Sequence, residues 1–259
     1  MSFLKKLKKR FKPKRKTAPF GGKVNLFVVG EQKCGTTSLH TLLVKSPLIC
    51  EGTRKEMHFF DRELGDVNDY EAAFQYEAGG PRPFYAIDSS PNYAWVEGGI
   101  ESIHAYNPDA KIIYLTRNPI DRFFSTYRFY RQNVDPNRKV FQETSRGRKM
   151  AQFIKANPNM PLEKFIEAEK STDPIFFALE RGKYDVMKRT IEAHFPANQI
   201  YYSSLEMLSN PDSSASELKR LADFLELGLG EASLPHSNVT RKDHATDQEI
   251  MAFLQDYYS

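Results

Sequence analysis

The chain alternates between short apolar runs and longer segments in which apolar residues recur every three or four positions. The first pattern predicts buried strands and the second predicts amphipathic helices. The predicted strands cover residues 24–29, 84–87, 111–117 and 199–202. The predicted helices cover residues 36–46, 120–132, a segment ending near 195, 215–225 and 248–258. Alternating strands and helices indicate an α/β fold with a mostly parallel sheet and a functional site at the carboxyl ends of its strands.

Residues 133–160 fit neither pattern well, because they are polar, charged and only weakly periodic. We expect either a mobile loop or irregular helix there, near the entrance of the site. The chain has 259 residues, of which 40% are hydrophobic and 27% charged, as expected for one globular α/β domain.

Two cysteines, Cys34 and Cys50, form no metal-binding or disulfide pattern, which favours a reducing compartment and no metal site. The longest apolar run is too short to cross a bilayer, and no secretory signal follows the basic start. We therefore expect a cytoplasmic protein.

The positive charge is concentrated at the start of the chain. Residues 1–23 contain ten basic residues and no acidic one, which leaves 27 basic against 33 acidic residues and a net charge of −6 for the rest. Four apolar residues at helical spacing suit a segment lying on an anionic membrane surface, namely Phe3, Leu4, Leu7 and Phe11. A solvated, disordered arm is the alternative. We expect residues 1–22 to be a basic, disordered tail and residues 23–259 to be the folded domain.

The first motif with clear chemistry lies between the first predicted strand and the helix that follows. Gly30–Ser38 holds two glycines, a lysine and three hydroxyl side chains. Backbone N–H groups of such a loop and the helix N-terminus bind phosphate, and the lysine adds charge. The residues expected to bind are Lys33, Cys34, Gly35, Thr36, Thr37 and Ser38. Lys33 precedes the second glycine, unlike the lysine of nucleoside-triphosphatase loops, which disfavours a magnesium-dependent kinase. Asp88 is the acidic residue to check as a magnesium ligand.

The second motif begins where the strand 111–117 ends. Arg117 is followed by Asn118 as a helix N-cap, Pro119 at the first helical position, and Ser125 about two turns into the helix. Arginine and hydroxyl can converge there on a second anion. Two anion sites together suggest a bisphosphorylated ligand.

These two motifs resemble the donor-binding signatures of sulfotransferases that use 3'-phosphoadenosine 5'-phosphosulfate (PAPS). Between them, Lys55–Asp61 and Asp88–Tyr93 are similar to segments of the branch that acts on glycosaminoglycans and of its bacterial relatives. The resemblance extends from about residue 23 to the C-terminus. It implies a P-loop-like three-layer fold, in which a central sheet is flanked by helices and sulfuryl transfer needs no metal.

The resemblance also implies roles for individual residues. Lys33 would contact the 5'-phosphosulfate and stabilise the leaving group, while Arg117 and Ser125 would hold the 3'-phosphate. Arg241 and Lys242 are similar to a basic loop that closes over the nucleotide.

Glu56 is the candidate base that removes the acceptor proton, and His58 is the competing candidate. The sequence departs from the family at Ser89, where the glycosaminoglycan enzymes have a lysine. This change removes a positive charge that can touch the donor or an anionic acceptor.

The sequence thus predicts an enzyme that moves a sulfuryl group from PAPS to a hydroxyl or amine, with a carbohydrate favoured over a phenol or steroid. We expect no specific nucleic-acid partner. Two alternatives stay open: a P-loop kinase-like phosphotransferase, and a non-catalytic protein that binds polyanions or membranes through its basic tail.

Overall fold

Five parallel strands form the centre of the computed structural model, which describes residues 16–62, 65–228, 234 and 248–259. The strands follow the order β3, β5, β2, β6, β7 across the sheet. Their bounds are Ile49–Glu51 (β3), Tyr85–Asp88 (β5), Leu26–Gly30 (β2), Lys111–Thr116 (β6) and Ile200–Ser204 (β7). Every neighbouring pair is parallel, so all carboxyl ends lie at the same edge of the sheet. The predicted α/β class with a parallel sheet is confirmed.

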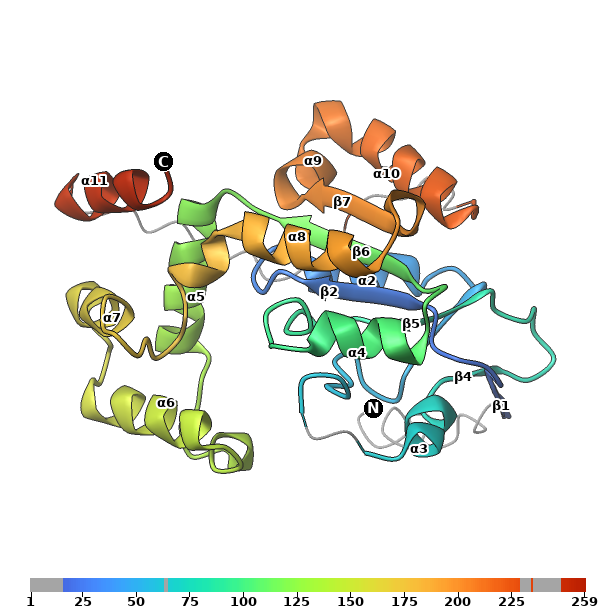
Figure 1. Cartoon of the computed structure of the whole chain (residues 1–259), viewed down its shortest axis with the longest axis horizontal. Helices are drawn as coiled ribbons and strands as arrows, with labels where there is room; N and C mark the ends of the chain where they lie inside the picture. The colour runs from blue at the N-terminus through green and yellow to red at the C-terminus, as the bar shows by residue number, and fades with distance from the viewer. Residues whose placement is uncertain (1–15, 63–64, 229–233, 235–247) are drawn as a thin grey trace, which may run out of the picture.

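Alternating side chains of the central strands serve two separate apolar layers. Phe27 of β2 and Ile112 of β6 face one layer, while Val28 and Ile113 face the other, because successive strand residues point to opposite faces. Helices α4 (Gly99–Tyr106) and α8 (Tyr184–His194) cover the first face. Helices α2 (Thr36–Leu43), α9 (Leu205–Ser209) and α10 (Pro211–Leu225) cover the second. The result is a three-layer arrangement (Figure 1).

A third apolar cluster lies beside the sheet rather than on it (Figure 1). It is built from α5 (Pro119–Gln132), α6 (Ser145–Ala156), α7 (Leu162–Glu169) and α11 (Gln248–Tyr257). The buried rings of Phe123, Phe165 and Phe176 form its centre. Short elements complete the described fold: α3 (Val67–Ala72), η1 (Lys139–Phe141), η2 (Glu180–Gly182) and η3 (Ala197–Gln199).

Two sequence expectations need correction. The segment 133–160 contains a regular helix, α6, whose first turn is capped by the Thr144 hydroxyl accepting the N–H of Gly147. Its weak apolar period arises because α6 buries only a narrow stripe. The second correction concerns the predicted tail. Thr17–Pro19 forms strand β1, which pairs antiparallel with β4 (Gln75–Glu77), and Phe20 packs into the core. Residues 17–20 therefore belong to the described fold; residues 1–15 lie outside the described part.

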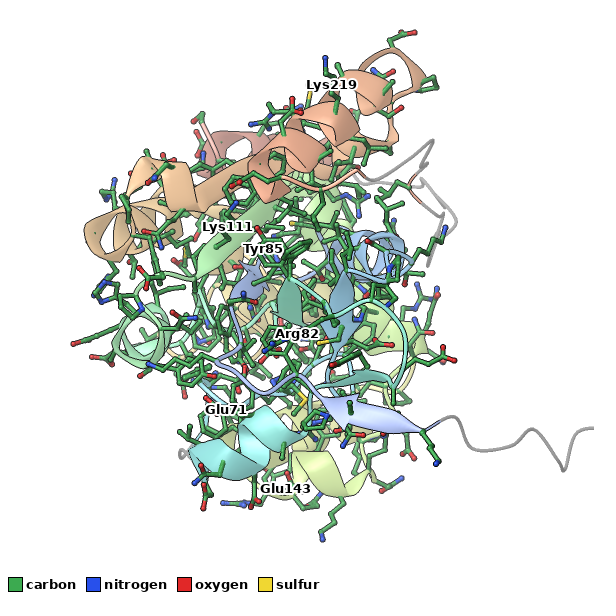
Figure 2. The ribbon with its side chains drawn as sticks, turned by 90° about the vertical axis from the view of Figure 1, so that its right-hand side faces the viewer. Glu71, Arg82, Tyr85, Lys111, Glu143 and Lys219 are labelled. Atoms are coloured by element: carbon green, nitrogen blue, oxygen red, sulfur yellow. The ribbon has the colours of Figure 1, made fainter. Side chains whose placement is uncertain are left out.

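The amino ends of the strands form the edge of the sheet opposite the predicted site. Tyr85 of β5 and Lys111 of β6 lie there (Figure 2), with the ammonium 5.7 Å from the ring centroid. Lys111 also donates to the carbonyl of Phe224 and pairs with Glu226 at the end of α10. The end of α10 therefore contacts this amino edge, opposite the edge at which the site is predicted. Among the described residues, no helix has both the length and the apolar character needed to span a bilayer.

Candidate active site

The two predicted motifs line one cavity at the carboxyl edge of the sheet. This first cavity has a volume of about 250 Å³. The first motif contributes Lys33, Gly35, Thr36, Thr37 and Ser38 to its wall. The second motif contributes Arg117 and Ser125. One space is thus surrounded by the backbone N–H groups at the start of α2, a lysine, an arginine and four hydroxyls. An anionic ligand with two phosphate groups requires such an environment.

The loop before α2 depends on Gly35, which is the N-cap of the helix and has a φ of +88°. A side chain there would be strained by this left-handed backbone, and its Cβ would lie 2.7 Å from Cδ1 of Leu205. Lys33 also has a positive φ of 70°, and its ammonium lies 4.3 Å from the ring centroid of Phe129 on α5. Leu205, at the start of α9, thus lies against the loop at Gly35.

Arg117 connects the two motifs directly, because its guanidinium donates to the carbonyl of Lys33 at 3.4 Å. Asn118 caps α5 as predicted, accepting the N–H groups of Ile120 and Asp121 at 3.1 Å each. This cap fixes the start of α5, and Ser125 is buried two turns later on the face toward the cavity. Neighbouring strands β2 and β6 therefore bring together residues more than 80 positions apart.

The side chain of Cys34, unlike those of its neighbours in the loop, does not line the first cavity. It is fully buried, and its sulfur lies 3.8 Å from the hydroxyl of Tyr184. Burial raises the pKa of the thiol to about 12, so it stays protonated and unreactive at neutral pH. Arg241 and Lys242 lie outside the described residues.

Glu56 and His58 lie in the loop between β3 and α3. The Glu56 carboxylate accepts from the Lys55 ammonium at 2.8 Å and lies 3.3 Å from Nε2 of His58. His58 Nδ1 lies 2.7 Å from the buried Asp61 carboxylate. The imidazole therefore sits between two carboxylates.

This arrangement sets both protonation states. The hydrogen bonds to Asp61 and then Glu56 raise the pKa of His58 to about 9 against the effect of burial. Burial acts to raise the pKa of Glu56, but the hydrogen bonds and charges of His58 and Lys55 outweigh it and lower that pKa to about 2. At neutral pH His58 is a cation without a free lone pair, whereas Glu56 is a carboxylate able to accept a proton.

Asp88, which the sequence suggested checking as a magnesium ligand, instead accepts hydrogen bonds inside the fold. Its buried carboxylate accepts hydrogen bonds from the hydroxyls of Tyr70, Ser90 and Tyr93 at 2.9, 2.7 and 2.7 Å. Ser90 and Tyr93 in turn accept the backbone N–H groups of the 58–59 segment. Asp88 at the end of β5 thus holds the Glu56 loop in place through a buried network. Among the described residues, no group of three acidic, histidine or cysteine side chains is placed to hold a metal ion.

A second cavity, of about 470 Å³, adjoins the first. The two share three lining residues, Gln32, Glu56 and Pro91, and His58 lines only the second. Glu56 therefore stands where the two spaces meet. A carboxylate at this junction can take a proton from a group in one cavity that attacks a group in the other.

Sequence reasoning missed the residues that build one side of the second cavity. Arg181, in η2, pairs with the fully buried Glu31 at 2.7 Å between Nε and Oε1. The same guanidinium donates to Asn92 at 3.1 Å and lies 5.2 Å from the ring centroid of Trp95. Arg181 and Glu31 are 150 positions apart. No local pattern signals such a pair; the only hint is an acidic residue inside a phosphate-binding loop.

Comparison with known proteins identifies a family that this chain resembles along most of its length. The family model described as the sulfotransferase domain matches residues 23–242. The human bifunctional heparan sulfate N-deacetylase/N-sulfotransferase 3 is 31% identical over 218 residues, covering 82% of this chain and 22% of that protein. The human heparan sulfate glucosamine 3-O-sulfotransferase 6 is 26% identical over 208 residues, covering 77% of this chain and 51% of that protein. The chain thus spans about half or less of these relatives.

Among solved structures, a sulfotransferase from Alicyclobacillus acidocaldarius has the same fold, with a TM-score of 0.60. It is 22% identical, and the alignment covers 91% of this chain and 93% of that one. The sulfotransferase domain of the Synechococcus PCC 7002 olefin synthase is similar with a TM-score of 0.51, 16% identity, and coverage of 92% and 88%.

Proposed function

Because this chain belongs to the sulfotransferase family, we propose that it transfers a sulfuryl group from PAPS to a hydroxyl or amine, with a carbohydrate as the acceptor. The observation that carries the proposal is the position of Glu56, at the junction of a cationic cavity and a second cavity large enough for an acceptor. The carbohydrate is proposed because the curated relatives are heparan sulfate sulfotransferases by name.

The first cavity suits the nucleotide. The start of α2 and Lys33 would hold the 5'-phosphosulfate, and Arg117 with Ser125 would hold the 3'-phosphate. Lys33 and Arg117 lie close enough for their charges to disfavour each other: burial and then the Arg117 charge lower the pKa of Lys33. A bound anion between them relieves this repulsion.

PAPS supplies an activated sulfuryl group whose bond to the bridging phosphate oxygen breaks as the acceptor oxygen bonds to sulfur. Glu56 takes the proton that the acceptor loses. A carboxylate with a low pKa can do so because the attacking oxygen loses its affinity for the proton as its bond to sulfur forms. Lys33 offsets the charge that develops on the bridging oxygen. The products are adenosine 3',5'-bisphosphate (PAP) and the sulfated acceptor.

The kinase-like alternative has weaker support. Asp88, the acidic residue nearest to a magnesium position by sequence, is enclosed by three hydroxyl donors and does not line the first cavity.

The decisive experiment compares wild-type protein with Lys33→Ala. Calorimetric titration with PAP and with ATP, and transfer of radiolabelled sulfate to a glycan panel, are the two measurements. Wild-type protein should bind PAP in preference to ATP and transfer label, and Lys33→Ala should lose transfer and bind PAP at least about tenfold more weakly. Lys45→Ala, an exposed lysine just beyond α2, is the matched control and should change neither. Normal transfer by Lys33→Ala, or tighter binding of ATP than of PAP, would contradict the proposal.

A further inference from the structure

The second cavity has more aromatic rings in its wall than the first, which is lined by one ring, that of Phe129. Trp95 and Phe177 lie with ring centroids 5.2 Å apart, and Tyr130 and Phe176 lie 4.4 Å apart. The volume of about 470 Å³ falls within the ordinary range for small-molecule pockets, roughly 300–1,000 Å³. Such a wall binds a flat ring through its faces.

The cations that face this cavity are already paired. Three of its described lining residues are cationic, namely His58, Arg146 and Arg181. The pairs are His58 with Glu56 and Asp61, Arg146 with Asp173 at 3.0 Å, and Arg181 with Glu31 at 2.7 Å.

The Arg146 guanidinium is held further by stacking 4.2 Å from the Phe177 ring centroid and by the Pro174 carbonyl. Asp173 also pairs with Lys149, which does not line the cavity. The described wall therefore offers an incoming carboxylate or sulfate no cation that lacks a partner.

An anionic group in this space would lose its hydration without gaining a new ion pair, which is costly. An uncharged hydroxylated ring would lose less hydration free energy than a charged one, and its apolar face would gain contact with the aromatic wall.

We propose that the acceptor group entering the second cavity is an uncharged hydroxylated ring with a flat apolar face, stacked against Trp95 and Phe177, rather than the anionic sugar of a glycosaminoglycan. The inference rests on the proposed function, because it places the acceptor hydroxyl toward Glu56 at the junction. It narrows the proposed carbohydrate acceptor to one with a neutral sugar ring.

The test is calorimetric titration of the full chain with PAP bound, which permits no turnover. Phenyl β-glucoside and phenyl β-glucuronide form a matched pair that differs only by a hydroxymethyl against a carboxylate group. We expect the glucoside to bind at least about tenfold more tightly, as expected for an uncompensated charge. Phenol alone, binding as tightly as the glucoside, would contradict the inference, because the sugar ring would then contribute nothing to binding.

Tighter or equal binding of the glucuronide, or no binding of any of the three compounds, would overturn the inference. PAP binding is measured first and separately. Absence of PAP binding would contradict the proposed donor site. Equal or tighter binding of the glucuronide to the PAP-bound protein would contradict only the inference about the acceptor.

A variant tests the cause of the preference. Asp173 is 62% exposed in its side chain, so Asp173→Asn should fold normally while weakening the compensation of the Arg146 charge. The glucuronide should then gain about threefold in affinity and the glucoside should not change, the scale of one exposed ion pair. Asp212→Asn, an exposed residue of α10 that lines neither cavity, is the control. An unchanged glucuronide affinity in Asp173→Asn would show that paired charges do not set the preference.

Discussion

The candidate site holds its charges in two different ways. In the first cavity, Lys33 and Arg117 face each other across a space that suits an anion, and the lowered pKa of Lys33 records the cost of burying it beside Arg117. Around Glu56, by contrast, Lys55, His58 and Asp61 each have an oppositely charged partner within 3.3 Å. The first arrangement gains stability when an anion binds, whereas the second is complete without a ligand and serves to hold Glu56 as a carboxylate.

Glu56→Gln should remove the proton acceptor while preserving the size of the side chain. We expect kcat to fall about a hundredfold or more, the scale of general-base loss, with PAP affinity almost unchanged. Steady-state transfer assays and PAP titration measure the two effects. Glu101→Gln, an exposed residue in the first turn of α4, is the control and should behave as wild type. A larger loss in His58→Ala than in Glu56→Gln would assign the base to His58 instead.

The pH dependence of kcat should report on His58. Its raised pKa, about 9, means that the cation persists at neutral pH and is lost as the pH rises through that value. Glu56, with a pKa of about 2, stays a carboxylate over the same range. We therefore expect a level profile from about pH 5 to about pH 8 and a decline centred near 9, because neutral His58 no longer donates to both carboxylates. His58→Gln should lack this decline; if the decline persists there, Lys33 or another group causes it.

At the scale of elements, two strand-to-helix connections build the first cavity, which is the proposed donor site. Strand β2 leads into α2 and the adjacent strand β6 leads into α5, so both helix starts lie at the same edge of the sheet. Asn118 fixes one start through two backbone hydrogen bonds, and Gly35 permits the other through its positive φ. The pairing of β2 with β6 therefore sets the distance between the two anion-binding groups.

Arg117→Ala tests whether the connection from β6 to α5 binds the 3'-phosphate while the connection from β2 to α2 binds the 5'-phosphosulfate. PAP should bind at least about tenfold more weakly, because a charge-assisted contact to the 3'-phosphate is lost, while adenosine 5'-phosphate should lose little affinity. Parallel titrations with the two nucleotides measure the difference. Arg131→Ala, which removes a guanidinium of α5 that lines neither cavity, is the matched control. Equal weakening of both nucleotides would place Arg117 elsewhere than at the 3'-phosphate.

What the sequence predicted at this scale depended on how local the signals were. The loop Gly30–Ser38 and the Asn118 cap were predictable because spacing, glycines and capping chemistry lie within a few residues. The helix α6 was missed because its buried stripe is narrow. The pair Arg181–Glu31 and the Asp88 network join residues distant in the chain, and only the folded sheet brings them together. Such contacts leave no periodic signal in the sequence.

At the scale of the whole molecule, the two cavities belong to different parts of the fold. The first is built on the sheet edge, whereas α5, α6 and the segment 174–181 form much of the wall of the second. Both the proposed donor side, which is the first cavity, and the proposed acceptor side, which is the second, lie within residues 23–242, which the family model matches. The acceptor side rests on the third apolar cluster, where a change of a few side chains alters what fits without disturbing the sheet.

The N-terminal boundary gives a final prediction. Deleting residues 1–15 removes eight basic residues but leaves β1 and Phe20. Sulfate transfer, PAP binding and melting temperature should therefore match those of the full chain. Deleting residues 1–22 also removes β1 and the Phe20 ring, whose burial contributes about 2 kcal/mol, so the melting temperature should fall by several degrees. Binding to anionic vesicles should be lost in both deletions if the tail contacts membranes. Loss of transfer in the shorter deletion, with melting unchanged, would contradict this prediction and show that transfer requires the basic tail.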